Sequence, residues 1–217
     1  MITFQLQKLS RVCNTFCGKV ICCKATFFDQ SISLTNVNMV GDLLEELFYP
    51  FYKEVCPFLI KGPKQSTPDF YDSKYNINYE QKAFCRNPNF DISNFSSFVN
   101  QLSKPMGINE KIFKTKYLIF EYRSSNEGFV ITKFWMTDIW KLVNYNRKYP
   151  LSIQVKRNIW YNIRPCSKNT WDDPEKTANK FIECLTECIQ MCPHLLDKEN
   201  IIESITNNWS RRIINAQ

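Results

Sequence analysis

Two neighbouring β-rich segments limit what this chain can fold into. The segment from Lys116 to Arg123, KYLIFEYR, is the clearest strand in the sequence, and Phe129 to Trp135, FVITKFW, follows it after the turn-like SSNEG. Patterns typical of helices occur before and after this pair of strands. The order of elements therefore predicts an α/β fold, with a mixed central β-sheet flanked by α-helices.

The expected helix over 39–55 has a defined apolar face and one breaking residue. Pro50 is expected to kink or end this helix. The residues that share its apolar face are Val40, Leu43, Leu44, Leu47 and Phe51.

The remaining elements have weaker signals. Within 2–35, the short apolar pieces from Val20 to Cys23 and from Ala25 to Phe28 are expected to be strands or irregular structure, and 159–163 is expected to be a late strand. The further helices are expected over 92–103, from a Thr137 cap to Val143, from Asp173 or Thr177 to Met191, and over about 198–213.

Length and composition are those of a globular chain. The 217 residues, 44% of them hydrophobic and 23% charged, suit a single domain over 1–217. No stretch approaches roughly 18 uninterrupted apolar residues, and the N-terminus lacks a basic start followed by an apolar run. We therefore expect neither a membrane span nor a secretory signal. The net charge of +7 permits a polyanionic partner without requiring one.

The ten cysteines do not predict a disulfide framework in a chain of this length without a secretion signal. The group Cys13, Cys17, Cys22 and Cys23 matches no common zinc spacing. Cys184, Cys188 and Cys192 recur at the spacing of a helical face, as small buried hydrophobic residues do. His194 is the only histidine, so a catalytic site of the Ser-His-Asp or Cys-His type depends on that one residue.

One hairpin carries a pattern with chemical consequences. Asp69 follows a proline at the start of a predicted strand, and a polar turn leads to a second strand over 79–84. Residues two apart in a strand share a face, so Glu80 and Lys82 point together while Gln81 points away. If the hairpin pairs, Asp69 arrives near Glu80. Two carboxylates at one point need a cation between them, and such hard oxygen ligands suit Mg²⁺, which can activate water for phosphodiester hydrolysis.

Lys82 is expected to orient or help deprotonate the attacking water, or to stabilise the negative oxygen that forms. The bare pattern is weak, because Asp72-Ser73-Lys74 supplies a second acid-x-Lys sequence in a polar turn, where it cannot form a strand site. The alternative is a solvated hairpin in which Glu80 and Lys82 form a same-face ion pair.

The sequence PDF, nine residues and then EQKAF resembles the PD-(D/E)xK nuclease core, and more narrowly that of type II restriction endonucleases. The resemblance covers about residues 40–135. It implies that Asp69, Glu80 and Lys82 are catalytic, and that Asp69 and Glu80 bind Mg²⁺ with the backbone carbonyl of Gln81 as a further ligand.

Many members of this superfamily also carry an acidic residue on the helix before the hairpin. Glu45 and Glu46 fit that position, and each is otherwise a surface-helix glutamate. EQKAF combined with WYNIRP, from Trp160 to Pro165, is similar to the small NgoBV-type restriction enzymes, whose target would be GGNNCC.

Positive charge is concentrated in an acid-free span over 144–168, where cations and aromatic residues are interleaved with asparagines. Such a mixture suits contacts to phosphates and base edges, and we expect Lys156, Arg157, Asn162 and Arg164 to bind DNA. The other members of the span are Tyr145, Arg147, Lys148, Tyr149, Trp160, Tyr161 and Lys168. The alternative is a basic solvated surface whose aromatic residues pack inward.

A further set of lysines flanks the predicted site, and its members are candidates for phosphate contacts or ordinary solvated lysines: Lys61, Lys64, Lys104, Lys111, Lys114 and Lys116.

The sequence favours a Mg²⁺-dependent type II restriction endonuclease that cleaves double-stranded DNA. Palindromic targets favour a homodimer, and the part over 136–217 is expected to serve DNA recognition, dimerisation or both. The resemblance implies a bacterial cytoplasmic protein with a cognate DNA methyltransferase. The alternatives are another nuclease on the same core, for repair or junction resolution, and a non-catalytic DNA-binding protein.

Overall fold

The computed structural model describes residues 2–22, 24–27, 30–33, 40–64, 66–143 and 148–214. The chain divides into two compact units. The first unit consists of Met1–Pro88 and Lys116–Thr137, and the second of Asn89–Thr115 and Asp138–Gln217. No helix among the described residues is long and apolar enough to cross a membrane.

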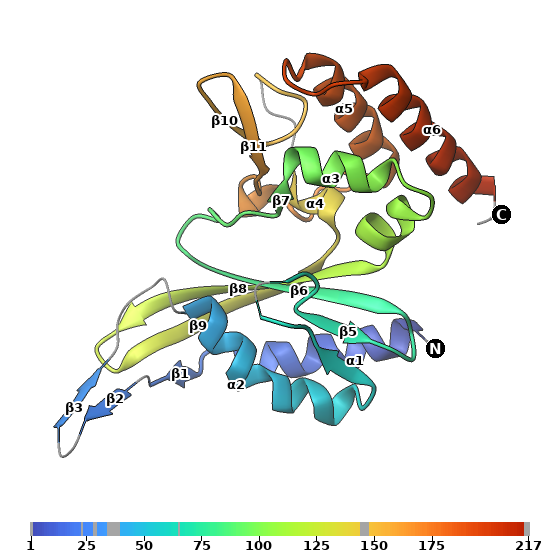
Figure 1. Cartoon of the computed structure of the whole chain (residues 1–217). Coiled ribbons are helices and arrows are strands. Elements are labelled where there is room, and N and C mark those ends of the chain that lie inside the picture. Colours follow the sequence, from blue (N-terminus) through green and yellow to red (C-terminus); the bar gives the residue numbers. More distant parts are fainter. Residues whose placement is uncertain are drawn as a thin grey trace. The chain divides into compact units, whose positions relative to one another are not determined.

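A six-stranded mixed sheet forms the centre of the first unit, as expected from the two β-rich segments (Figure 1). The strands β8 and β9 are each somewhat longer than the strand expected there. They pair antiparallel, and a two-residue turn joins Ser125 to Gly128. The order across the sheet is β1 (Val20–Ile21), β9 (Gly128–Thr137), β8 (Thr115–Ser125), β6 (Ile77–Cys85), β5 (Phe70–Asp72) and β4 (Leu59–Lys61). A separate hairpin pairs β2 (Lys24–Phe27) with β3 (Gln30–Ser33).

Helix α2 (Val40–Val55) confirms the expected helix but corrects its face and its end. The buried stripe follows a spacing of four residues: Val40, Leu44, Phe48 and Tyr52. Leu47 and Phe51, expected on that face, are 42% and 48% exposed. Pro50 lies inside the helix without ending it. Its position on the exposed side explains this, because water can hydrate the carbonyl that loses its backbone partner.

Whereas β1 and β2 confirm the strands expected within 20–28 over their described residues, helix α1 (Ile2–Thr15) lies where no helix is expected from the sequence. Its buried residues Gln5, Leu9 and Cys13 have helical spacing, but the first of them is polar. The Gln5 amide donates to the carbonyl of Val55 at 2.6 Å, so a polar side chain occupies a core position and interrupts the apolar pattern.

Aromatic rings join α1 and α2 to the sheet. Phe16 stacks on Phe48 with 4.0 Å between ring centroids, and Phe48 lies 5.1 Å from Phe120 of β8. Phe120 in turn lies 4.9 Å from Phe134 of β9. These rings bury large apolar areas at one place, so they fix both helices against the sheet that carries the β5–β6 hairpin.

The second unit combines a three-stranded antiparallel sheet with helices. The sheet has the order β10 (Ile153–Lys156), β11 (Ile159–Ile163) and β7 (Ser93–Asn94), and β11 matches the expected late strand. The helices are α3 (Phe95–Leu102), a π-helix (Asn109–Phe113), α4 (Ile139–Leu142), a 3-10 helix (Lys168–Thr170), α5 (Ala178–Met191) and α6 (Lys198–Ile214).

Helix caps decide two of the expected helix starts. Thr177 caps α5, since its side chain accepts a hydrogen bond from the backbone N–H of Lys180, which settles the choice between Asp173 and Thr177. The expected Thr137 cap is wrong. Thr137 is the last residue of β9, and Asp138 is the N-terminal flanking residue of α4.

The cysteines of α5 confirm the expected apolar face. Cys184, Cys188 and Cys192 are buried, and the described cysteines are free thiols. Cys13 is buried as well, whereas Cys23 lies outside the described residues. Among the described residues, no three His, Cys, Asp or Glu side chains form a group that could hold a metal ion.

A buried lysine organises the segment before α5. Lys176 is 2% exposed, and its ammonium donates to the Lys141 carbonyl at 3.1 Å, the Cys166 sulfur at 3.0 Å and the Thr170 hydroxyl at 2.8 Å. Each donor of the ammonium thus meets a neutral acceptor.

We predict that Lys176→Met destabilises the protein by about 1–3 kcal/mol, because the apolar stem of the side chain remains while three part-buried acceptors lose their donor. Urea unfolding monitored by circular dichroism measures the change. Lys180→Met is the control, since this exposed side chain pairs with Glu183 at the surface, and it is expected to change stability little. Equal effects of the two substitutions would contradict the role given to Lys176.

Candidate active site

The register of the β5–β6 hairpin brings the predicted acids together. Phe70 pairs with Tyr79 and Asp72 with Ile77, so the same register places Asp69, one residue before β5, opposite Glu80. The Asp69 carboxylate accepts a hydrogen bond from the backbone N–H of Gln81 at 2.6 Å. Asp69 is therefore fixed against the strand that carries Glu80.

Alternation along β6 places the other predicted residues as expected. The Lys82 ammonium donates to Glu80 Oε1 at 2.6 Å, so the two side chains share one face. Glu80 is 5% exposed. The Gln81 side chain points to the opposite side, where its Oε1 accepts a hydrogen bond of 2.7 Å from the buried Tyr52 hydroxyl of α2.

Two residues that the sequence did not single out support this arrangement. Tyr52 holds Gln81, and Gly62 approaches the backbone just before β5, where its N–H donates to the Asp69 carbonyl at 2.7 Å. A Cβ atom on Gly62 would overlap the carbonyl oxygen of Pro68. In the sequence, Gly62 is one glycine in a turn-rich loop, and no pattern separates it from an ordinary turn residue.

The electrostatics of the site favour an additional cation. Burial, together with the charge of Glu80, raises the pKa of the Asp69 carboxyl to about 6. Burial and the charge of Asp69 raise the pKa of Glu45 to about 7. Burial alone would lower the pKa of the Lys82 ammonium, but the neighbouring carboxylates raise it above its ordinary value. The site thus holds more negative charge than one ammonium offsets.

The structure distinguishes the two glutamates of α2. Glu46 is exposed and pairs with Lys61 at 2.6 Å, and this pairing lowers its pKa. Glu45 is half-buried, and its carboxyl responds to the charges of Asp69 and Lys82. Both line a cavity of about 420 Å³ that Asp69 also borders. Of this pair, Glu45 is therefore the one whose carboxyl is influenced by the charge of Asp69.

The second acid-x-Lys sequence has a structural role. The buried Asp72 carboxylate accepts hydrogen bonds from the backbone N–H groups of Lys74 at 3.0 Å and Tyr75 at 3.1 Å, which closes the turn between β5 and β6. The Lys74 ammonium lies 5.1 Å from the centre of the Phe58 ring. This pair accordingly shapes the hairpin that positions Asp69 and Glu80.

The donor set at the hairpin fits a hard divalent cation. Asp69 and Glu80 offer carboxylate oxygens, and Gln81 between Glu80 and Lys82 adds a backbone carbonyl. These are oxygen donors in a small number, as suits a metal ion that keeps several waters. Since no three His, Cys, Asp or Glu side chains of the described residues form a metal-binding group, these two carboxylates would need the backbone carbonyl and water to complete the coordination.

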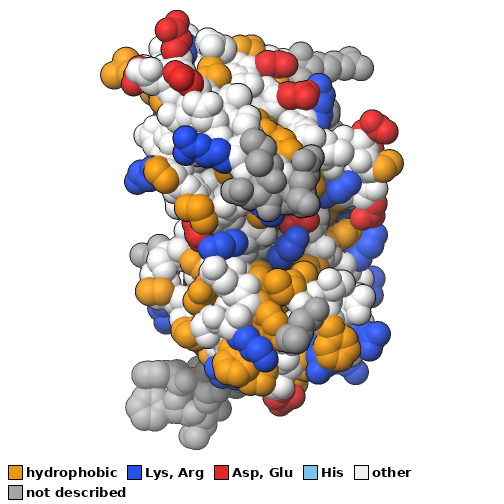
Figure 2. Space-filling model, turned by 90° about the vertical axis from the view of Figure 1, so that its right-hand side faces the viewer, with side chains coloured by type: hydrophobic (Ala, Val, Ile, Leu, Met, Phe, Trp, Pro, Cys, Tyr) orange, Lys and Arg blue, Asp and Glu red, His pale blue; other side chains and the backbone are white. Residues whose placement is uncertain are grey.

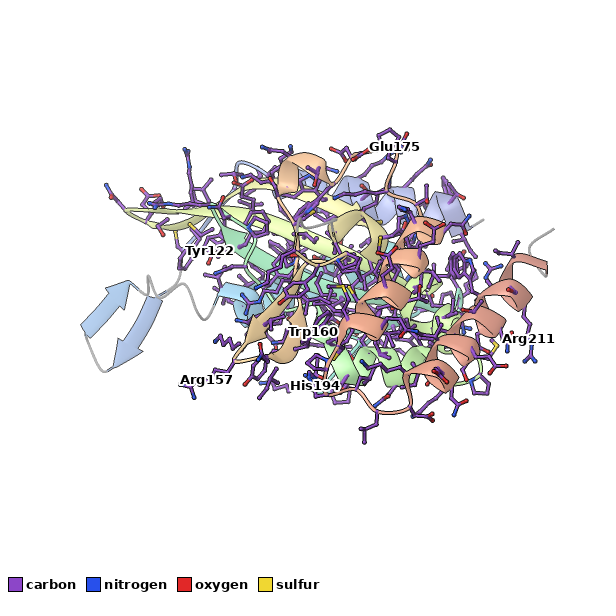
Figure 3. The ribbon with its side chains drawn as sticks, turned by 90° about the horizontal axis from the view of Figure 1, so that it is seen from above. Tyr122, Arg157, Trp160, Glu175, His194 and Arg211 are labelled. Atoms are coloured by element: carbon purple, nitrogen blue, oxygen red, sulfur yellow. The ribbon has the colours of Figure 1, made fainter. Side chains whose placement is uncertain are left out.

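The expected DNA-binding residues occupy different environments in the second unit. Lys156 and Arg157 are exposed at the end of the β10–β11 hairpin, and Figure 3 shows Arg157 at its tip. Asn162 lies opposite Asn94 in the antiparallel pairing of β11 with β7. Arg164 is engaged within the unit, since it pairs with Asp91 at 2.8 Å. The expected residues Tyr145 and Arg147 lie outside the described residues.

The flanking lysines are also not equivalent. Lys61 and Lys64 line the cavity beside Asp69, whereas Lys114 pairs with Glu110 at 2.6 Å in the second unit. Figure 2 shows Lys and Arg side chains interspersed with hydrophobic groups over one face of the molecule.

Comparisons with known proteins identify a family and a similar fold. A family model described as NgoBV restriction endonuclease matches residues 8–217. Among solved structures, the chain is similar to that of the NlaIV restriction endonuclease, with a TM-score of 0.76 at 18% identity over 92% of this chain and 85% of that chain. A search of curated proteins gives no match. At this identity, the structural likeness concerns the fold.

We predict that Gly62→Ala destabilises the protein by about 1–3 kcal/mol, because the added methyl group forces the backbone before Asp69 to move. The free energy of unfolding in urea measures this. Gly41→Ala in α2 is the matched control, since a Cβ there meets nothing within 4 Å and alanine favours the helix. A Gly62→Ala protein as stable as the Gly41→Ala protein would contradict the close approach.

Proposed function

Because the chain belongs to the NgoBV restriction endonuclease family, and is thus a type II site-specific deoxyribonuclease, we propose that Asp69, Glu80 and Lys82 carry out its hydrolysis of phosphodiester bonds in double-stranded DNA. The observation that carries this assignment is the convergence of the three side chains. Glu80 and Lys82 share one face of the strand, with 2.6 Å between Lys82 Nζ and Glu80 Oε1. The backbone N–H of Gln81 holds the Asp69 carboxylate beside them.

Restriction endonucleases generally use a divalent metal ion, and we propose Mg²⁺ for this one. Asp69, Glu80 and the backbone carbonyl of Gln81 would hold it, because these hard oxygen donors match its preference. Bound there, the ion would supply a water of lowered pKa and a positive charge for the phosphoryl oxygen.

Lys82 acts next to these carboxylates. An ammonium has three N–H donors, and one of them is used on Glu80. The others are available to orient the attacking water and to stabilise the negative charge that builds up on the phosphoryl oxygens. We also assign Glu45, rather than Glu46, as the acidic residue of the preceding helix that joins the site, since Glu46 is engaged with Lys61.

We propose that the two units together form one nuclease domain over 1–217, with the core over about 40–135 supplying cleavage and the part over 136–217 supplying recognition. Lys156 and Arg157 are exposed and suit direct contacts to DNA. Asn162 and Arg164 remain candidates at the base of the same hairpin, where Arg164 needs to exchange its pairing with Asp91 to reach DNA.

The assembly and setting follow from the substrate. A palindromic target matches a two-fold dimer, so we propose a homodimer in which each protomer cuts one strand. Because unmodified host DNA carries the same target, a cognate DNA methyltransferase is expected in the same bacterial cytoplasm.

Digestion of a sequenced plasmid tests the proposal. With Mg²⁺, the wild-type protein is expected to give discrete fragments whose mapped ends share one sequence, with GGNNCC as the first sequence to compare. The number of fragments must match the number of copies of that sequence. A wild type that stays inert with both Mg²⁺ and Mn²⁺ on varied DNA would contradict the proposed function.

We predict that Lys82→Ala lowers the cleavage rate by at least about a hundredfold, because it removes the charge that stabilises the transition state, while the protein still binds target DNA. Single-turnover cleavage and a gel-shift measurement separate these effects. Lys74→Ala is the matched control, since this lysine belongs to the other acid-x-Lys sequence and packs over Phe58. Cleavage by Lys82→Ala at the rate of the Lys74→Ala protein would rule out the assigned role.

A further inference from the structure

The β10–β11 hairpin has a firmly held base. Trp160 is 4% exposed, and the centre of its ring lies 5.2 Å from that of Phe95 and 4.9 Å from that of Tyr149. Arg164 donates to the Asn89 carbonyl at 3.0 Å and pairs with Asp91 at 2.8 Å. These contacts fix the strands of the hairpin to the rest of the second unit.

The tip of the hairpin has an unusual backbone for its sequence. Lys156 pairs with Ile159, which leaves Arg157 and Asn158 as a two-residue turn. Their φ angles are +50° and +63°, the pattern of a type I′ turn. Asparagine and glycine adopt these angles readily, so Asn158 suits its position. A long side chain such as that of Arg157 adopts them reluctantly, so the turn retains a residue that opposes it.

No contact of Arg157 with the described part of the chain offsets the cost of this backbone conformation. Its side chain is exposed, and it forms no hydrogen bond or ion pair with any residue that the structure describes. Figure 3 shows it directed away from the body of the second unit, whereas Trp160 of the same hairpin points inward. Backbone strain that brings no internal contact is typical of residues kept for function.

The chemistry of the tip matches a base edge of double-stranded DNA. A two-stranded antiparallel ribbon fits the major groove, and an arginine is the side chain that most often reads guanine there, through its O6 and N7 atoms. Lys156 and the 39%-exposed Tyr161 lie along the same hairpin and suit phosphate contacts.

We propose that the β10–β11 hairpin enters the major groove of the target and that Arg157 reads one of its guanines. The inference rests on the proposed function, because it names the element that selects the DNA to be cut. It also separates the two arginines of the hairpin, since Arg164 holds the base and Arg157 recognises the target.

The test uses Arg157→Asn, a substitution that favours the turn while removing the guanidinium. Arg86→Asn is the matched control, because Arg86 is another exposed arginine with a positive φ of +70°. Both variants are expected to unfold at the wild-type temperature or above it. The substrates are the mapped target duplex and the duplexes that carry each single-base change, and kcat/KM is measured on every one.

Arg157→Asn is expected to lose about tenfold to a hundredfold in kcat/KM on the mapped target and to lose discrimination at one G·C pair, whereas Arg86→Asn keeps both. A duplex with 7-deazaguanine at that position lacks the N7 acceptor. It is expected to slow the wild type and to leave the Arg157→Asn protein unaffected.

Two outcomes would overturn the inference, and a third would overturn the function on which it rests. Unchanged discrimination at every position shows that Arg157 reads no base. An equal loss on the target and on all changed duplexes shows a phosphate contact instead. A wild-type protein that cleaves no DNA would contradict the proposed function itself. If the wild type cleaves specifically and the Arg157→Asn protein has the same specificity, only this inference is contradicted.

Discussion

The register of the β5–β6 hairpin is the constraint on which the rest of the site depends. Side chains alternate along a strand, so a slip of one residue would exchange Gln81 with its two charged neighbours. It would turn Glu80 and Lys82 toward the buried side of α2, where the Tyr52 hydroxyl now meets the Gln81 amide at 2.7 Å. Burying an unsatisfied charge among aromatic rings costs far more than a surface contact returns, so the packing of α2 protects the register.

The same packing places more carboxylates than cations at the site. Glu80 is nearly buried, and its partner Lys82 compensates one negative charge. The Asp69 carboxylate accepts a hydrogen bond from a backbone N–H, and the Lys82 ammonium that pairs with Glu80 also acts on Asp69 and Glu45. Burial, and after it the charge of the neighbouring carboxylates, raises the pKa of both carboxyls. A fold keeps such a cluster when a bound cation offsets its cost, which joins the architecture to the proposed metal.

Local patterns predicted the parts of the structure that depend on neighbours in sequence. Alternation was enough to place Glu80, Gln81 and Lys82, and the spacing of apolar residues to place α5. Long-range contacts decided the rest. Gln5 is buried because Val55 accepts its amide, which no pattern around residue 5 reveals. Our proposal of Glu45 over Glu46 likewise rests on Lys61, a residue on another element.

The arginines of the second unit show why charge counted along a sequence overstates a binding surface. Arg157 and Arg164 belong to one acid-free span and were equivalent there, yet an acid outside the span, Asp91, engages Arg164. Arg157 instead stands exposed on a turn whose positive φ disfavours it. The charge of Arg164 serves to fix the strands of the hairpin. The charge of Arg157 lies at the tip, on a backbone conformation that arginine disfavours, and is available to a partner. Conformation and pairing, more than net charge, therefore separate Arg164, which holds this hairpin, from Arg157, which we propose for recognition.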